Sequence, residues 1–239
     1  MLLSNPSGMK TKLTPELAEI VAIITGDGHL QIKQWKHLVS FYSKDLKEIS
    51  RVNDLFKKVF DIEGHIYKDS SHSKKTRGST LRYKLFFISK SVTLLLNELG
   101  VSKGNKTNTP FQVPKWILNA PDKIKSAYLT GLFDCEGYVC CSNLKTGKTR
   151  WQISINMCKN EALLSNGLFF MNQLRELLSS FGIKSSPVRT VKENIRKDGS
   201  QSISMRFDIE KSSFRNFYKY VGFHIREKQM KLLSALNEG

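Results

Sequence analysis

The sequence has few cysteines and prolines and no long apolar stretch. Its four cysteines, Cys135, Cys140, Cys141 and Cys158, form no Cys-x-x-Cys pair, so neither a zinc ribbon nor a disulfide framework is indicated. No uninterrupted apolar run approaches membrane-spanning length, and residues 1–10 lack the pattern of a secretory signal. We therefore expect a reduced, intracellular protein without a membrane partner. Its compartment would be the cytoplasm or nucleoid, or an organelle in a eukaryotic host.

Acidic residues are also scarce relative to basic ones. The 239-residue chain has 38 Lys and Arg against 21 Asp and Glu, a net charge of 38 − 21 = +17. Split at Ala120, the halves carry 19 − 10 = +9 and 19 − 11 = +8. An even excess over two folded halves favours contact with an extended polyanion, most commonly nucleic acid. General colloidal charge is the alternative, but it does not predict basic residues gathered on particular strands.

Two segments, residues 17–28 and 126–137, resemble each other. Each is an apolar stretch of helical length closed by an acid and a glycine. A spacing of four residues places small side chains on one helix face, where they allow two backbones to approach closely. We therefore predict that the two helices pack together and bring Asp27 and Glu136 side by side. The small residues are Ala18, Ala22 and Gly26 in the first segment, and Ala127, Gly131 and Cys135 in the second.

Two acids just past two helix C-termini need a counter-charge, because a helix C-terminus already carries partial negative charge. Carboxylate oxygens suit Mg²⁺, a hard cation that also takes phosphate oxygens from a substrate. The pattern thus predicts a metal-dependent phosphodiester site at Asp27 and Glu136. The alternative is that each acid-glycine pair is only a helix stop. Recurrence of the acid, the glycine and the small-residue face favours the first interpretation.

The two stretches 20–28 and 129–137 resemble the two copies of the LAGLIDADG motif in single-chain homing endonucleases. The first copy departs from the motif at Ala22 and Thr25, where Gly and Asp are usual, but keeps its closing acid. The resemblance implies an α+β fold of two αββαββα repeats in pseudo-twofold arrangement. It also implies antiparallel saddle-shaped sheets, motif helices at the interface, and divalent-metal cleavage of both DNA strands.

The rest of the chain fits this repeat order. We expect an N-terminal repeat in 1–105, a linker in 106–121, and a C-terminal repeat with an extra helix in 122–239. The motif acids lie 136 − 27 = 109 positions apart, as one repeat of a duplicated fold requires. The sequence predicts helices at 14–25, 45–60, 91–99, 122–133, 161–181, 213–221 and 226–236, and strands at 29–33, 38–43, 63–70, 80–89, 138–143, 150–157, 183–191 and 202–210.

The predicted strands alternate apolar residues with polar or basic ones, so one sheet face is expected to stay wet. Side chains of these types bond to base edges and phosphates, and two-stranded ribbons fit the DNA major groove. Any solvated antiparallel sheet shows such alternation, so the net charge is needed to favour DNA binding. The candidate DNA contacts are Lys33, Lys44, Lys74, Lys75, Arg77, Arg82, Lys84, Arg150, Gln152, Ser154, Asn156, Lys159, Arg189, Ser202, Ser204 and Arg206.

The resemblance implies further site residues. A lysine after the last helix of each repeat would hold water near the scissile phosphate, and Lys106 and Lys228 occupy those positions. Either could instead be an ordinary solvated charge among the 38 basic residues. The family pattern also implies Mg²⁺ or Mn²⁺, with two or more ions held by Asp27, Glu136 and the carbonyls of Gly26 and Cys135.

We therefore expect a site-specific endonuclease that cuts double-stranded DNA at a long, pseudo-palindromic target, as a monomer without an obligatory protein partner. The alternatives are a maturase that binds intron RNA and a DNA-binding protein of the same fold that does not cut. An intein is disfavoured, because Met1 is not a splicing nucleophile and the sequence 237–239 lacks a terminal His-Asn pair. We expect a freestanding protein encoded within an intron.

Overall fold

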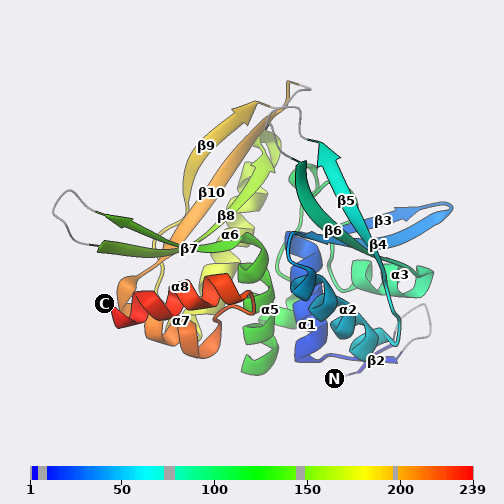
Figure 1. Cartoon of the computed structure of the whole chain (residues 1–239), viewed down its shortest axis with the longest axis horizontal. Coiled ribbons are helices and arrows are strands. Elements are labelled where there is room, and N and C mark those ends of the chain that lie inside the picture. Colours follow the sequence, from blue (N-terminus) through cyan, green and yellow to red (C-terminus); the bar gives the residue numbers. More distant parts are fainter. Residues whose placement is uncertain (1, 5–9, 73–78, 144–148, 196–198, 239) are drawn as a thin grey trace.

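The computed structural model describes residues 2–4, 10–72, 79–143, 149–195 and 199–238. Two sets of elements follow the same order of helix, strand pair, helix, strand pair and helix (Figure 1). The α+β fold of two αββαββα repeats, predicted from the sequence, is thereby confirmed. The first set is α1 (Pro15–Gly26), β3 (His29–Lys33), β4 (Lys36–Ser43), α2 (Leu46–Phe60), β5 (His65–His72), β6 (Ser79–Ile88) and α3 (Lys90–Glu98). The second is α5 (Asp122–Glu136), β7 (Gly137–Asn143), β8 (Thr149–Asn160), α6 (Leu164–Ser179), β9 (Arg189–Ile195), β10 (Gln201–Ile209) and α7 (Phe214–Tyr220).

The remaining elements lie at the ends of the chain and at the joints. Strands β1 (Leu2–Ser4) and β2 (Lys10–Lys12) pair with each other, and α8 (Arg226–Asn237) follows the second repeat. The joining segment holds η1 (Lys106–Asn108) and α4 (Lys115–Leu118). Short 3-10 turns, η2 (Glu161–Leu163) and η3 (Lys211–Ser213), precede α6 and α7. Over the described residues, we find no helix with the length and apolar character that crossing a bilayer requires.

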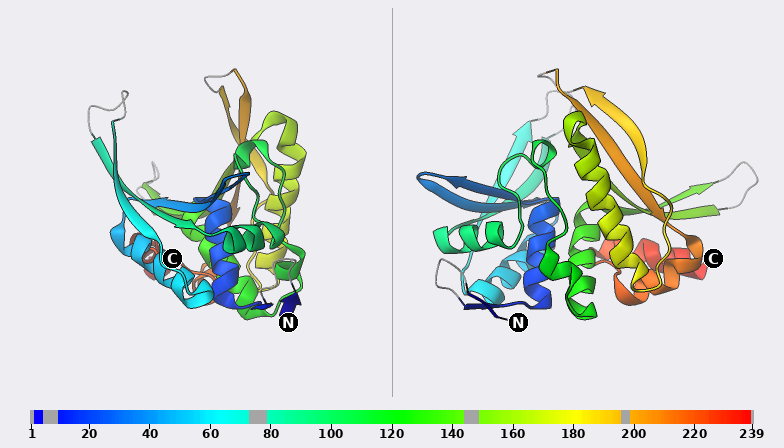
Figure 2. Two further views of the ribbon diagram at one scale, coloured as in Figure 1. Left: turned by 90° about the vertical axis from the view of Figure 1, so that its right-hand side faces the viewer. Right: turned by 180° about the vertical axis from the view of Figure 1, so that it is seen from behind.

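Each repeat contributes one four-stranded antiparallel sheet, ordered β3-β4-β6-β5 and β7-β8-β10-β9. Apolar residues that alternate along the strands, such as Phe41 and Phe87 in the first sheet, are buried against the helices. The helices lie on one side of the sheets, and α1 and α5 stand between the two sheets (Figures 1 and 2). We call the sheet face away from the helices the open face.

Helices α1 and α5 approach each other as closely as the small-residue pattern predicts. A Cβ atom added at Gly26 would lie 2.4 Å from Cβ of Cys135, and one added at Gly131 would lie 3.0 Å from the carbonyl oxygen of Glu19. The contact at Gly26 excludes a Cβ atom and the one at Gly131 is tighter than an ordinary Cβ contact, so the two helices pack closely at both positions. The closing residues of the helices are thereby brought together.

Most predicted bounds shift by one to three residues in the structure, and two of the differences bear on the site. Helix α5 continues to Glu136, so this acid is the last helical residue rather than one beyond the end. The strand predicted at 183–191 begins only at Arg189. Pro187 has no N–H to donate to a ladder, and the backbone of Ser186 bonds to that of Asp208 outside a regular strand (2.8 Å). The regular strand therefore begins only after Pro187, at Arg189.

Candidate functional site

The two motif acids come from two repeats and meet at the ends of α1 and α5. Asp27 is the C-cap of α1, and its N–H donates to the carbonyl of Ile23 (3.0 Å). Cγ of Glu136 lies 3.6 Å from the point that a Cβ on Gly26 would occupy. The Glu136 side chain therefore lies against the residue that precedes Asp27, in the arrangement that the paired motifs predict.

The pKa values of both carboxyl groups are raised above their ordinary values. Burial and the neighbouring charge of Asp27 raise the pKa of Glu136 to about 7, although Lys106 and Lys228 oppose the shift. Burial likewise raises the pKa of Asp27, again against the two lysines. Asp27 still keeps an exposed edge, because it lies beyond the helix end. Both acids therefore bind a proton more readily than a free carboxyl group does, and Asp27 can be reached from outside.

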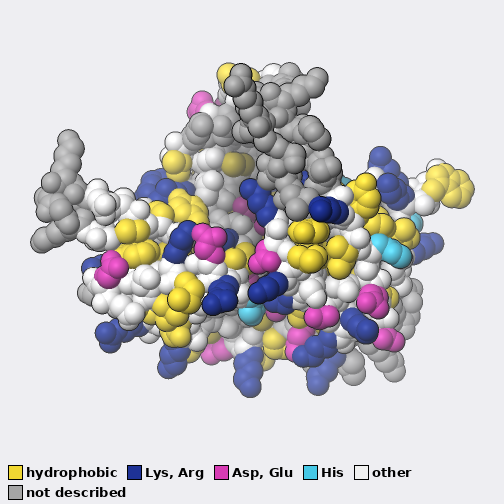
Figure 3. All heavy atoms as spheres, viewed as in Figure 1, with side chains coloured by type: hydrophobic (Ala, Val, Ile, Leu, Met, Phe, Trp, Pro, Cys, Tyr) yellow, Lys and Arg dark blue, Asp and Glu magenta, His cyan; other side chains and the backbone are white. Residues whose placement is uncertain are grey.

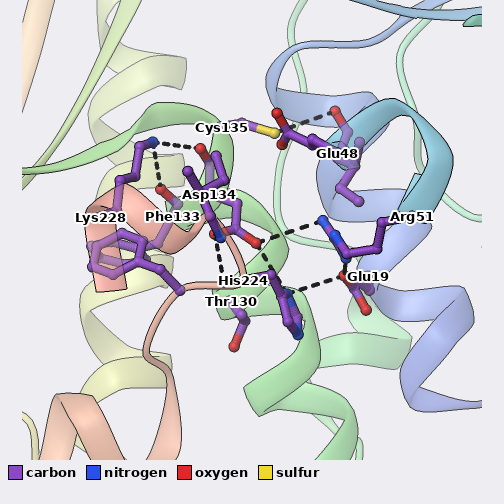
Figure 4. Close-up of polar contacts among 12 residues, drawn as sticks. Glu19, Glu48, Arg51, Thr130, Phe133, Asp134, Cys135, His224 and Lys228 are labelled. Atoms are coloured by element: carbon purple, nitrogen blue, oxygen red, sulfur yellow. Dashed lines mark hydrogen bonds and ion pairs between the residues drawn. The ribbon is translucent and has the colours of Figure 1, made fainter. Parts of the chain in front are cut away.

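The two predicted lysines reach the same helix ends. Nζ of Lys106 donates to the carbonyl of Gly26 at the end of α1. Nζ of Lys228, on α8, donates to the carbonyls of Gly137 (2.6 Å) and Asp134 at the end of α5 (Figure 4). A cation at a helix C-terminus is favourable, and here each also lies near the acid pair. Burial lowers the pKa of Lys106, an effect that Glu136 opposes first.

Of the predicted carbonyl ligands, that of Gly26 is already engaged by Lys106. The Cys135 side chain packs at the interface, where its thiol lies 3.8 Å from the carbonyl of Ile23. Burial raises the pKa of this thiol well above its ordinary value, so it stays protonated and is not a thiolate ligand.

Lys159, predicted as a DNA contact, is instead buried, with 2% of its surface exposed. Its Nζ donates to the carbonyls of Lys106 (2.7 Å) and Thr109 (2.5 Å) and lies 3.5 Å from the ring centre of Phe111. Burial and the nearby Lys106 lower its pKa to about 8. Lys159 therefore ties the joining segment to the second sheet, and in doing so fixes the backbone of Lys106.

A hollow of about 590 Å³ opens beside Asp27. It combines acids with cations and includes Glu48, whose carboxyl accepts a hydrogen bond from Oγ of Ser43 (2.6 Å). Burial raises the pKa of Glu48. Residues of both repeats form its walls, and acidic and basic side chains lie side by side in it. Its other lining residues are Tyr42, Lys44, Arg82, Asp134, Cys135, Ile225 and Lys228.

A second charged cluster crosses the α1–α5 interface (Figure 4). Nδ1 of His224 lies 3.0 Å from Asp134 and 3.3 Å from Glu19, and Arg51 forms ion pairs with both acids. One oxygen of Asp134 also accepts the backbone N–H groups of His224 (2.9 Å) and Ile225 (3.2 Å). The cluster therefore joins α1 and α2 of the first repeat to α5 and α8 of the second.

Glu19, Asp134 and His224 also have the donor atoms of a metal site, with one atom from each within 4.8 Å of the others. Arg51 already supplies positive charge there, so the geometry fits an ion-pair network better than a metal. We did not predict this network from the sequence. The available signal was Glu19, a charged residue inside the otherwise apolar stretch 17–26.

The predicted DNA contacts divide by exposure. The exposed ones are Lys33, Lys44, Arg82, Arg150 and Arg189, and the partly buried ones are Lys84, Gln152, Asn156 and Arg206. Three serines face the open side but are buried and are not available for contact in this structure: Ser154, Ser202 and Ser204. Basic side chains are spread over both halves of the molecule (Figure 3). Lys74, Lys75 and Arg77 lie outside the described residues.

Residues 123–222, which form most of the second repeat, match the family model of the LAGLIDADG-like domain. The chain is a two-motif LAGLIDADG protein. Its fold is similar to that of the homing endonuclease I-WcaI bound to its DNA recognition sequence, with a TM-score of 0.53, 17% identity, and coverage of 93% of this chain and 88% of that one.

The curated relatives of this LAGLIDADG protein are named for activities other than DNA cleavage. One is the tRNA-splicing ligase RtcB of Methanopyrus kandleri, 33% identical over 71% of this chain and 17% of the relative. Another is the glutamine–fructose-6-phosphate aminotransferase of Methanocaldococcus jannaschii, 28% identical over 98% of this chain and 19% of the relative. The chain thus spans about a fifth of the length of these relatives.

Proposed function

We propose that this LAGLIDADG protein is a site-specific endonuclease that hydrolyses both strands of double-stranded DNA with the help of divalent cations. The observation that carries the proposal is the meeting of Asp27 and Glu136 from two repeats at one point, with Lys106 and Lys228 beside them. Paired carboxylates flanked by cations suit phosphoryl chemistry, because the acids hold metal and the cations attract phosphate.

The residues present fit a divalent metal. The donors are hard carboxylate oxygens, which Mg²⁺ and Mn²⁺ prefer. The pKa of Glu136 is raised to about 7, partly by the charge of Asp27, and a divalent cation would relieve that repulsion. We therefore assign Asp27 and Glu136 as the metal-holding residues. When bound, the metal supplies a Lewis acid for a phosphoryl oxygen and lowers the pKa of a water molecule.

The chain's own residues supply positioning and charge. Lys106 and Lys228 lie where negative charge would increase on the phosphoryl oxygens as water attacks. Their ammonium groups are held by backbone carbonyls, so little reorganisation is needed during the reaction. The two open faces would bind the duplex on either side and place one scissile phosphate beside each lysine. A net charge of +17 supports binding to this polyanion.

The curated relatives support a self-contained module. An RNA ligase and an aminotransferase share no chemistry, yet each matches this chain over about a fifth of its own length. Neither activity can reside in a segment common to both, so ligation and aminotransfer are not proposed here. Whether the gene of this protein lies within an intron stays a prediction.

The test is selection of cleaved duplexes from a random-sequence library with Mg²⁺, followed by cleavage of a plasmid that carries the selected site. We expect linear plasmid from the wild type and none from Asp27→Asn or Glu136→Gln, with DNA binding retained. Glu227→Gln, the same change of charge at an exposed acid of α8, is the matched control and should cut normally. Full cleavage by either motif variant would refute the assignment. Assistance to group I intron splicing without cleavage would instead favour a maturase.

A further inference from the structure

Asp208 is an acid on the open face of the second sheet, and it binds two arginines. Its Oδ2 lies 2.5 Å from Nη2 of Arg189, and its Oδ1 lies 2.8 Å from Nε of Arg206. Arg206 on β10 is directly opposite Arg189 on β9 in the antiparallel register. Side chains of such a cross-strand pair emerge on the same face, so the two guanidinium groups stand beside each other with one acid between them.

Residues on neighbouring strands also hold Asp208 and Arg206 in place. Oγ of Ser154 donates to Oδ1 of Asp208 (2.7 Å), and the Arg206 guanidinium lies 5.3 Å from the ring centre of Tyr138. Burial raises the pKa of Asp208, but hydrogen bonds from Ser154, Arg206 and Arg189 together hold it below its ordinary value. The acid therefore stays ionised at neutral pH, and the arginines keep fixed orientations.

Asp208 is not expected on a surface that serves only to bind phosphate groups. A carboxylate repels the DNA backbone and reduces the local charge of two arginines to +1, so a phosphate-binding surface would be stronger without it. Fixed orientation matters instead for reading bases, because an arginine recognises guanine through two parallel hydrogen bonds to O6 and N7 in the major groove. The Arg206 ion pair uses Nε, so the terminal nitrogens of its guanidinium are not the atoms that bind Asp208.

We propose that Arg189 and Arg206, oriented by Asp208, read guanine bases in the half of the target that faces the second repeat. The inference rests on the proposed function, since it requires duplex DNA on the open faces. Asp208 is a positioning residue in this scheme, and the two arginines are specificity-determining residues. Because they stand opposite each other on neighbouring strands, they would contact two guanines close together in one half-site.

The open face of the first sheet also carries cations beside aromatic rings. Nζ of Lys84 lies 5.6 Å from the ring centre of Tyr42 and 5.5 Å from that of Phe86, and Arg82 lies over Tyr42 at 5.4 Å. This stacking is similar to that of Arg206 on Tyr138, so aromatic rings orient cations on both sheets. The guanine pair assigned here is the one in the half-site that faces the second sheet.

The experiment is selection of bound duplexes from a random library in EDTA, where binding is measured without cleavage. The wild type should enrich two nearby guanines in one half-site. Arg206→Lys and Arg189→Lys should each lower discrimination against a substituted base at one of these guanines by about tenfold, since lysine lacks the planar fork. Arg215→Lys, on the helix side of the second repeat, is the matched control and should change nothing.

Asp208→Asn separates a positioning role from a structural one, because it should change guanine discrimination and overall DNA affinity in opposite directions. Discrimination at the guanines should fall, whereas affinity for random-sequence DNA should rise as one negative charge leaves the open face. A residue needed only for folding would lower both. Glu227→Gln changes the net charge equally on α8 and should leave guanine discrimination intact.

The outcomes separate the two proposals. If no duplex sequence is enriched, the proposed function falls and this inference falls with it. If a target is enriched but lacks the guanine pair, or if both lysine variants retain full guanine discrimination, only the assignment of Arg189 and Arg206 is overturned. Arg189 is half exposed, with 50% of its side chain accessible, so Arg189→Lys tests the proposal even if Asp208→Asn folds poorly.

Discussion

The network around Asp134 predicts a large loss of stability when its carboxylate is removed. Asp134 is 1% exposed, pairs with His224 and Arg51, and accepts two backbone N–H groups. Asp134→Ala would leave those groups without their acceptor inside the α1–α5 interface. Arg51 keeps its pair with Glu19, and the His224 side chain is 43% exposed, so the main cost is that of the two backbone N–H groups left without an acceptor, about 1–3 kcal/mol. For a chain of this size that corresponds to a fall in Tm of about 2–12 °C.

The pH dependence of the same network has a defined sign. The hydrogen bond to Asp134, followed by the charge of Glu19, raises the pKa of His224 against the opposing effect of burial. A raised folded pKa means that the stabilisation is complete below the unfolded value of about 6.5 and is lost as pH rises through the folded value. The stability difference between the wild type and His224→Gln should therefore shrink over that window. Taking the difference cancels the contribution of Glu136, which titrates nearby.

Urea unfolding of both variants at several pH values measures these effects through the midpoint at unchanged slope. Glu227→Ala is the matched control: it removes an exposed acid of α8 that pairs with Lys231 four residues on, in a contact that water screens, so it should leave the unfolding midpoint unchanged. A loss below about 1 kcal/mol for Asp134→Ala would show that the network does not hold the repeats together, and the reasoning from burial would be wrong. A stability difference for His224→Gln that grows with rising pH would contradict the assigned pKa direction.

Three further predictions concern the motif helices. Because the pKa of Glu136 is about 7, apparent Mg²⁺ affinity should fall by about tenfold per pH unit below 7, and pH titrations of the half-saturating Mg²⁺ concentration for cleavage would show this. Gly131→Ala would place a Cβ 3.0 Å from the carbonyl of Glu19 and should cost about 1–3 kcal/mol in urea unfolding, whereas Lys123→Ala on the exposed side of α5 should be neutral. Lys228→Met should slow single-turnover cleavage by about 10²–10³-fold at unchanged DNA affinity, and an unchanged rate would remove this lysine from the site.

The repeat order could be predicted from the sequence because hydrophobic periodicity and the paired motifs both depend on local spacing. Two of the small residues that indicated helix packing, Gly26 and Gly131, lie at the closest approaches of the two helices. The prediction of a strand at 183–191 was wrong in its first part, and the reason is also local, since Pro187 interrupts the hydrogen-bond ladder. Most of the fold could therefore be predicted from the spacing of residues that are near one another in the sequence.

The electrostatic partners could not be predicted in this way, because they depend on which side chains meet across the repeats. Lys159 stands in an alternating strand, but its ammonium group turns to the carbonyls of Lys106 and Thr109 and is buried. Ser154 faces the open side as expected, yet Asp208 occupies its hydroxyl. Alternation assigns a side chain to a face, whereas burial depends on neighbours from distant strands.

The two repeats hold their site lysines by different means. In the second repeat, Asp134 accepts the N–H groups of His224 and Ile225 at the start of α8, and Lys228 on that helix returns to the Asp134 carbonyl. In the first repeat, Thr25 replaces the corresponding motif acid, so this anchor is lost. The backbone of Lys106 is instead held by Lys159 from the other repeat. The departure of the first motif from the family pattern is thus matched by a cross-repeat contact, and the position of one site lysine depends on the packing of both halves.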